Sequence, residues 1–457
     1  MDRKHASSND PENKNGLLKV LGLWDSVALS VGIVIGVGIF RVPSEIARHL
    51  SSGWLILLAW LIGGAFSLLG AACYAELASS FPETGGDYVY LKKSYGGWAA
   101  FLYGWSGILV VRTGVIAAIS FIFAEYFVSF FELPSSMVKT VAVLIILFLS
   151  LVNIIGLKEG KLLQNVSVIA KVFALVLIMF LGALSARGAF ANFRSTFTPP
   201  QGENIINLMA LALVPVLWTY GGWHENTFVT GETLDARRVL PKALLLSVGL
   251  ITLLYMSMNA VYIYLIPVDK MKESPLIVSD IMSLLFGRSA KKALEALIMV
   301  SAFGALNGTI ITSARINYAM GRDNRLFRFM GLVQKRFRSP AFSIGVNGFW
   351  SILLLLWGTF TRLLFFTGLL VWIFFAMIVA GVLVLRIKHP DMERPFKVWG
   401  YPITPVIFVL ASLWLVANII IHYPAESFLG IALTMTGIPV YLISKKLSRH
   451  KNRILPG

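Results

Sequence analysis

The chain has 457 residues, of which 57% are apolar and 14% are charged, and its mean hydropathy is +0.75. A soluble protein of this length cannot bury so much apolar surface, so the composition excludes the soluble classes and indicates a membrane protein. The formal net charge of +17 does not indicate nucleic-acid binding, because the basic residues form short clusters between apolar blocks, with no basic stripe and no recognition motif.

Twelve apolar segments follow one another along the chain. Crossing about 30 Å of hydrocarbon takes roughly 20 helical residues, and a backbone in lipid must pair with itself, so each segment is predicted to be a spanning helix. The first sixteen residues lack a signal-peptide pattern, so the first helix is expected to be retained. The predicted segments are 21–50, 53–80, 97–131, 138–156, 161–184, 204–232, 243–266, 292–321, 341–359, 361–386, 403–422 and 427–443.

The basic residues predict the orientation of the chain. With the N-terminus inside, about 26 lysines and arginines fall on the inner side and about 10 on the outer side. This excess places both termini in the cytoplasm, because basic loops are retained on that side of a membrane.

Two segments carry glycines inside an apolar helix: VGIVIGVGIF at 31–40 and WTYGGW at 218–223. If the first ten segments are two repeats of five, these two correspond, and paired glycine-interrupted helices are typical of transporter binding sites. Close helix packing is the alternative, since Gly32 and Gly36 fit a small-xxx-small pattern. Two breaks are favoured because Gly36 and Gly221 both lie roughly 16 Å from the expected cytoplasmic edge.

An unwound helix exposes backbone N–H and C=O groups, which are costly in hydrocarbon unless a ligand binds them. A zwitterion meets this need: its carboxylate takes N–H groups at the start of the second half-helix, and its ammonium takes freed carbonyls. No charged side chain is needed. The predicted substrate contacts are Val37, Gly38 and Ile39 for the carboxylate, and Val34, Ile35, Trp218, Thr219 and Gly221 for the ammonium.

Five stretches carry motifs in a fixed order: VIGVGIFRVP (34–43), YAELASSFPETGGDYVYL (74–91), LWTYGGWHENTFVTGE (217–232) followed by RRVLPKAL, FGALNGTIITSAR (303–315) and RPFKVWGYPITP (394–405). The first resembles the Ile-Gly-Ser-Gly-Ile-Phe signature of the amino acid–polyamine–organocation superfamily. The others are similar to stretches of that superfamily, in particular of the prokaryotic members of its L-type amino acid transporter branch. The resemblance runs from about residue 17 to residue 446.

The resemblance implies an all-α integral membrane protein of LeuT-like fold that moves L-amino acids by alternating access. It implies twelve transmembrane helices, in a five-plus-five inverted repeat plus two C-terminal helices, with helices 1 and 6 unwound at mid-membrane. The predicted divisions are a polar cytoplasmic tail at 1–16, a first repeat at 17–200, a second repeat at 201–386, two further helices at 387–446 and a cytoplasmic tail at 447–457.

Two pocket residues depart from the family pattern and a third fits it. Val37 stands where the family usually has serine, so a hydroxyl near the carboxylate is lost while backbone binding remains. Thr219 stands where alanine is common and is expected to narrow the pocket. Trp218 occupies the aromatic position that closes over the substrate from outside in the family, with a place in the interfacial aromatic belt as the alternative.

Lys171 lies ten residues into the fifth segment, roughly 15 Å deep, where a lysine is costly and indicates a function. In the resembling transporters a lysine here bridges the first break and segment eight, where relatives hold sodium. The resemblance therefore implies contacts of Lys171 with the carbonyls of Val34 and Ile35 and with the region of Asn307 and Thr309. Snorkelling toward the inside is the alternative, although the stem reaches only about 6 Å from Cα.

Other charged residues also fall in apolar segments. Arg112 has no partner that the sequence identifies. His224 and Glu225 are expected to form a polar lining of the inward vestibule, with a proton-carrying pair as the alternative. Arg41 and Glu45, four residues apart, are predicted to form a local ion pair.

Other functional classes are disfavoured. The sequence has no H-E-x-x-H motif, phosphate loop or nucleophile elbow, which argues against an enzyme, and no cofactor or metal is expected. A scaffold linked to a heavy subunit by a disulfide is not expected, because the outer loop FELPSSMVK at 131–139 has no cysteine. A polyamine or cationic amino acid substrate is the alternative within transport, although both breaks are free of acids.

The sequence therefore predicts a sodium-independent transporter of neutral L-amino acids that works by exchange or proton-coupled uptake. The expected location is a prokaryotic plasma membrane. The expected partners are small neutral or larger apolar L-amino acids and the lipid bilayer, with no nucleic acid.

Overall fold

The computed structural model describes residues 21–83, 85–155, 160–185, 187–194, 199, 203–274, 276–323, 327–332, 334 and 339–452. The predicted tail at 1–16 lies outside these residues. The described part is all-helical, apart from one isolated bridge between Leu21 and Thr233, so the predicted all-α class is confirmed there. The elements are α1 (Leu23–Val34), α2 (Gly38–His49), α3 (Gly53–Ser80), α4 (Asp87–Tyr95), α5 (Gly97–Ser106), the π-helix η2 (Gly107–Val111), α6 (Arg112–Phe130), η3 (Ser135–Met137), α7 (Val138–Ile155), α8 (Gly160–Ala183), η4 (Phe190–Arg194), α9 (Ile205–Tyr220), η5 (Glu225–Glu232), α10 (Ala236–Leu265), α11 (Val268–Met271), α12 (Ile277–Asp323), α13 (Ala341–Trp357), α14 (Phe360–Lys388), α15 (Ile403–His422), α16 (Pro424–Met435) and α17 (Gly437–Asn452).

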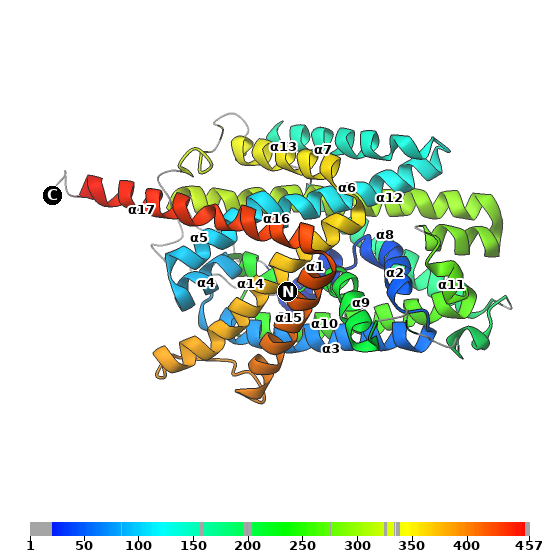
Figure 1. Ribbon diagram of the computed structural model, residues 1–457, viewed down its shortest axis with the longest axis horizontal. Helices are drawn as coiled ribbons and strands as arrows, with labels where there is room; N and C mark the ends of the chain where they lie inside the picture. The colour runs from blue at the N-terminus through cyan, green and yellow to red at the C-terminus, as the bar shows by residue number, and fades with distance from the viewer. Residues whose placement is uncertain are drawn as a thin grey trace, which may run out of the picture.

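The helices form an elongated bundle. Most long helices run along the long axis, with α3 and α10 on one side and α7 and α13 on the other (Figure 1). In the described part, eight helices are long and apolar enough to cross a membrane, or nine if the bent pair of α1 and α2 is one span. Three shorter apolar helices add to these: Lys171–Ala183, Ile205–Tyr220 and Ala341–Trp357. The chain is thus a multi-pass membrane protein, while the twelve spans and the inverted repeat stay predictions.

The helix boundaries follow the apolar pattern at some ends and not at others. α3 and α15 begin and end at the predicted residues. α10 begins at Ala236, before its apolar segment, because polar turns extend the helix. α12 begins at Ile277, but its backbone is not helical at Gly287, where φ is +79°, so the part after this break begins close to the predicted residue 292. The last predicted segment is divided, since α16 ends at Met435 and α17 begins at Gly437. α17 then continues to Asn452, so the predicted C-terminal tail begins as helix.

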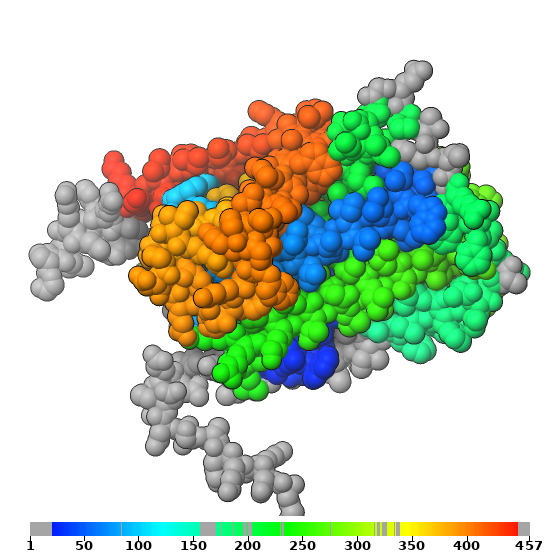
Figure 2. All heavy atoms as spheres, turned by 90° about the horizontal axis from the view of Figure 1, so that it is seen from below, coloured from blue at the N-terminus to red at the C-terminus, as the bar shows by residue number. Residues whose placement is uncertain are grey.

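α3 packs closely against α9 and α10, and this contact holds the end of α9 in place. A Cβ added to Gly63 of α3 would overlap Val216 Cγ1 of α9, so glycine allows the helices to approach. The buried rings of Trp60, Tyr220 and Tyr255 then join the three helices, with centroids 5.2 to 5.8 Å apart. Figure 2 shows α3 in blue and α10 in green lying side by side.

Candidate functional site

The first span is interrupted between Val34 and Gly38, at the second and third of its three glycines. α1 ends at Val34 and α2 begins at Gly38, with a bend of 49° between them. The Gly36 N–H donates to the Val34 carbonyl over 2.6 Å. Within the described part, the N–H groups of Val37, Gly38 and Ile39 donate no backbone hydrogen bond, and no side chain caps α2. The predicted interruption is confirmed, and the start of α2 presents three N–H groups without a backbone partner.

The sixth predicted segment is interrupted as well. α9 ends at Tyr220, and the Gly221 N–H turns back to the Trp218 carbonyl over 3.0 Å. Gly222 follows with a φ of +105°, a conformation that favours glycine. The chain then continues as η5, a 3₁₀-helix, where the sequence predicts that the same apolar helix resumes. α9 therefore ends at the predicted glycine pair, and the continuation of the same span through η5 stays a prediction.

The two interruptions lie against each other. A Cβ added to Gly38 would lie 2.9 Å from Thr219 Cγ2, and one added to Gly222 would lie 2.9 Å from Ile33 Cγ2. The two breaks can approach each other this closely because Gly38 and Gly222 have no side chain. Solvent reaches the main chain of the breaks chiefly at three partly exposed glycines. These are Gly36 in the first break and Gly221 and Gly222 in the second. The other predicted contacts are buried, except for the half-buried Trp218: Val34, Ile35, Val37, Gly38, Ile39 and Thr219.

Tyr255 of α10 ties the two breaks together and was not identified from the sequence. Its hydroxyl donates to the Val34 carbonyl over 2.7 Å and lies 3.3 Å from the Thr219 carbonyl. A tyrosine in an apolar span has the same pattern as a core residue, so the sequence carried no signal of this role. The Val34 carbonyl thus has two partners, whereas that of Ile35 accepts no hydrogen bond from a described residue.

An aromatic and charged layer covers the breaks on the α2 side. The Trp218 ring meets Phe360 of α14 edge to face, with centroids 5.9 Å apart. The Arg41 guanidinium lies 4.8 Å from the centroid of the same phenyl ring. Arg41 pairs with Glu45 and with Glu125 of α6, each at 2.9 Å, which confirms the predicted Arg41–Glu45 pair. We call these three charged residues the Arg41 cluster. The gating role of Trp218 stays a prediction.

Lys171 is only 2% exposed, on the apolar part of α8. The structure shows none of the predicted contacts with the first break among the described residues. Asn307 Oδ1 instead accepts a hydrogen bond from Asn153 Nδ2 over 2.7 Å, and Thr309 Oγ1 donates to the Ala305 carbonyl over 2.8 Å. The bridging role of Lys171 therefore stays a prediction, and its burial is the finding.

Arg112 has a partner that lies far away in the sequence. Its Nη1 is 2.6 Å from Glu225 Oε1, and its guanidinium lies 5.5 Å from the Phe228 ring centroid. His224 does not share this carboxylate: its Nε2 lies 3.6 Å from Asp87 Oδ2, at the start of α4. The neighbours His224 and Glu225 thus have different ion-pair partners, which does not support the alternative in which the two form a proton-carrying pair with each other.

The π-helix η2 precedes Arg112 and sets its direction. A π turn inserts one residue into a helix and rotates the side chains that follow, and such turns are frequent at functional sites. The Thr113 hydroxyl donates to the Ile108 carbonyl, five residues back, over 2.9 Å. Trp350 Nε1 of α13 donates to the Leu109 carbonyl over 2.6 Å. The carbonyls freed by the π turn are therefore paired.

Comparisons with known proteins agree with this architecture. The family described as amino acid permease matches residues 21–443. The chain belongs to this family. The b(0,+)-type amino acid transporter 1 of Mus musculus is 30% identical over 452 residues, covering 97% of this chain and 91% of the relative. The large neutral amino acids transporter small subunit 2 of Homo sapiens is 30% identical over 470 residues, covering 97% and 85%. The resemblance to the amino acid–polyamine–organocation superfamily is confirmed, and the family and these relatives are transporters.

A second charged cluster of the permease lies at the far end of α3. Glu76 is 2% exposed and accepts hydrogen bonds of 2.9 and 2.6 Å from Arg386 and one of 2.8 Å from the Val398 N–H. Arg394 lies 3.5 Å from the same carboxylate. The Arg386 guanidinium also stacks 3.9 Å from the Tyr401 ring centroid. This Glu76 cluster (Glu76, Arg386 and Arg394) fastens the connection between α14 and α15, which contains the fifth motif, to α3.

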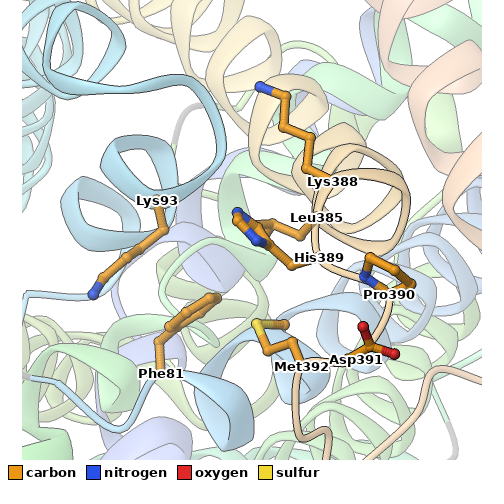
Figure 3. A pocket seen from close by; sticks show the side chains of 8 residues that line it. All are labelled: Phe81, Lys93, Leu385, Lys388, His389, Pro390, Asp391 and Met392. Carbon is orange, nitrogen blue, oxygen red and sulfur yellow. The ribbon is translucent and has the colours of Figure 1, made fainter.

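A pocket of about 410 Å³ beside this connection is separate from the breaks of the permease. Figure 3 shows the ammonium groups of Lys93 and Lys388 pointing away from each other, so the pocket does not gather positive charge at one point. Lys93 is moreover paired with Glu83 at 2.8 Å. The pocket is lined by Phe81, Lys93, Leu385, Lys388, His389, Pro390, Asp391 and Met392.

Proposed function

We propose that the permease carries neutral L-amino acids across the membrane without sodium, by alternating access with exchange or proton-coupled uptake. The observation that carries this proposal is the pair of helix breaks lying against each other. The N–H groups at the start of α2 bind the substrate carboxylate, aided by the positive end of the helix dipole. The break carbonyls bind the ammonium, and those of Ile35 and Gly221 accept no hydrogen bond from a described residue.

The side chains around the breaks favour a neutral substrate. Val37 offers no polar group, and the Thr219 hydroxyl is used within its own helix, donating to the Pro215 carbonyl over 2.9 Å. Neither break segment contains an acid, and the acid that follows, Glu225, is bound to Arg112. One relative is named a large neutral amino acids transporter. A polyamine or cationic amino acid is the alternative substrate, and it would need a free acid in the pocket.

Sodium independence rests on Lys171. A buried ammonium on α8 supplies the positive charge that a bound sodium ion would supply, and it leaves no need for the ion. We infer that Lys171 acts through the carbonyls of the first break and through the α12 region that contains Asn307 and Thr309. Its burial supports this role, because a lysine without a function is rare at such a position.

The proposed topology has both termini in the cytoplasm, at the plasma membrane. α1 with α2 and α9 with η5 are then the corresponding first spans of two inverted repeats. A disulfide-linked subunit is not part of the proposal, because Cys73, the only cysteine, is fully buried in α3. A membrane-embedded enzyme and a non-transporting scaffold are the distant alternatives.

The test is counterflow in sodium-free proteoliposomes. Vesicles loaded with unlabelled leucine or alanine are expected to accumulate the same labelled amino acid transiently, and protein-free vesicles are the control. A competitor panel of the twenty amino acids plus putrescine then identifies the substrate class. No counterflow with any of the twenty would discard the proposal, and inhibition by arginine or putrescine alone would favour the cationic alternative.

A further inference from the structure

Asp87 and His224 form a buried pair just beyond the second break. Asp87 is the first residue of α4 and is 1% exposed, and His224 is 7% exposed. Asp87 Oδ2 accepts a hydrogen bond from the Tyr103 hydroxyl over 3.0 Å and lies 3.6 Å from His224 Nε2. Asp87 Oδ1 and His224 Nδ1 are buried and have no hydrogen-bond partner in the described part of the chain. Two titratable groups thus each keep one polar atom unused inside the protein.

The groups around Asp87 include one possible unpaired cation, which is His224. Tyr74 of α3, Tyr90 of α4 and Tyr103 of α5 lie around Asp87 and bring hydroxyl groups, not cations. α6 contributes Arg112, but Glu225 of η5 pairs with that guanidinium at 2.6 Å. The remaining contacts of His224 are the aromatic rings of Tyr74, Trp223, Phe228 and Phe375, with centroids 4.9 to 5.9 Å away. Among the described residues, only a protonated His224 can therefore compensate an ionised Asp87.

This arrangement links the burial of the pair to one proton. A buried charge without a partner is strongly disfavoured, so the pair is stable while buried only with one proton on it. That proton makes either an imidazolium beside a carboxylate or a neutral imidazole beside a carboxylic acid. When water hydrates the site, the pair can also exist without this proton, as an ionised aspartate beside a neutral histidine. Net coupling then requires that the pair takes up its proton while it is reached from the outer side and releases it while water reaches it from the inner side.

The pair also moves with the substrate site. His224 lies two residues after Gly222, the positive-φ residue of the second break, and the Glu225 N–H donates to the Gly222 carbonyl over 3.0 Å. A movement of this segment during alternating access would displace His224 from Asp87. We propose that Asp87 and His224 together are the proton-binding site of the permease, occupied while the pair is buried, so that one proton enters the cell with each amino acid. This inference rests on the proposed transport function.

The experiment compares gradient-driven uptake with counterflow in the same proteoliposomes. Vesicles without internal amino acid receive a gradient of about one pH unit, acidic outside, with the membrane potential clamped by potassium and valinomycin. With one proton per substrate, this gradient supports an accumulation of up to about tenfold. Asp87→Asn and His224→Gln are expected to lose this accumulation. Asp391→Asn and His389→Gln, the same changes at exposed positions, are the matched controls and are expected to keep it.

The outcomes separate this inference from the proposed function. If the unaltered protein shows counterflow but no gradient-driven accumulation, the proton site is overturned and amino acid transport stands. If it shows neither, the proposed function itself fails. Accumulation that survives in both Asp87→Asn and His224→Gln also overturns the site.

A milder variant covers the case in which these two do not fold. Tyr103→Phe removes one hydrogen bond to the Asp87 carboxylate. Since that hydrogen bond stabilises the ionised form of Asp87, its loss favours the protonated form. The pH midpoint of gradient-driven uptake is therefore expected to move upward. An unchanged midpoint in a folded Tyr103→Phe variant would count against the site.

Discussion

Two buried cations of the permease have different surroundings. Arg112 has Glu225 at 2.6 Å, so its charge is compensated within the protein. Lys171 is 2% exposed and has no hydrogen-bond or ion-pair partner among the described residues. A buried ammonium without a partner costs free energy, and such a group is retained mainly where it acts. We therefore expect Lys171 to serve transport and not packing.

Lys171→Met keeps the length of the side chain and removes its charge. Sodium-free counterflow is expected to fall about tenfold or more, which corresponds to a loss of about 1.4 kcal/mol of interaction free energy. The unfolding temperature is expected to stay the same or rise, because an uncompensated buried charge is removed. Initial rates of labelled leucine counterflow and thermal unfolding in detergent measure the two effects.

The control for this change is Lys270→Met, which removes the same charge at an exposed position of α11. It is expected to leave both quantities unchanged. Unchanged counterflow in Lys171→Met, or stimulation of the unaltered protein by sodium, would contradict the role of Lys171.

The sequence predicted side-chain pairs only where they are local. Arg41 and Glu45 are four residues apart on one helix, and this spacing alone places them in contact. The partners of Arg112 and His224, by contrast, depend on how α4, α6 and η5 pack together. Asp87 was not selected as a site residue because the GGDYVY stretch that contains it lies outside the apolar segments. Long-range pairing of this kind requires tertiary structure.

At the scale of helices, both breaks depend on glycine, but for different reasons. Gly38 lacks a Cβ where α2 approaches α9, and Gly222 takes a positive φ. Gly32 lies within the regular turns of α1 and is not part of the break. The paired glycines therefore predicted that the helices are interrupted and roughly where. They did not predict the 3₁₀ form of η5 or the π turn of η2, because helix packing selects these forms.

Gly38→Ala tests the contact between the two breaks. The new Cβ would lie 2.9 Å from Thr219 Cγ2, and overpacking of this kind costs about 1–3 kcal/mol. We expect a lower unfolding temperature and slower counterflow, with partial recovery in the Gly38→Ala/Thr219→Ala double variant. Gly249→Ala on α10 is the control, because no atom lies within 4 Å of its added Cβ. Equal behaviour of Gly38→Ala and Gly249→Ala would show that the breaks do not touch as described.

Across the whole molecule, α14 connects the two charged clusters that flank the breaks. Its first residue, Phe360, contacts Trp218 and lies beside the guanidinium of the Arg41 cluster. Its Arg386 binds Glu76 in the other cluster. Twenty-six residues separate the two positions, or about 39 Å along a helix. The proposed alternating access requires one end to loosen while the other stays closed, and under that proposal the two clusters hold alternate ends of the permease closed.

Glu76→Gln tests this arrangement, because it keeps the shape of the side chain and removes its charge. Hydrogen bonds to charged groups contribute about 1.5–3 kcal/mol each, so a clear loss of stability is expected in thermal unfolding. Glu393→Gln is the control: it breaks a 2.9 Å pair with Arg237, but that carboxylate is 75% exposed, and such pairs contribute about 0–1 kcal/mol. A labelling experiment tests whether the Glu76 cluster holds one end closed. Ser79 is fully buried beside this cluster, and it is replaced by cysteine in protein whose native Cys73 has been removed. If the cluster holds this end closed, the new cysteine reacts faster with a maleimide in the Glu76→Gln variant than in the protein with Glu76. Equal labelling with and without the substitution would mean that the cluster stabilises the fold without controlling access.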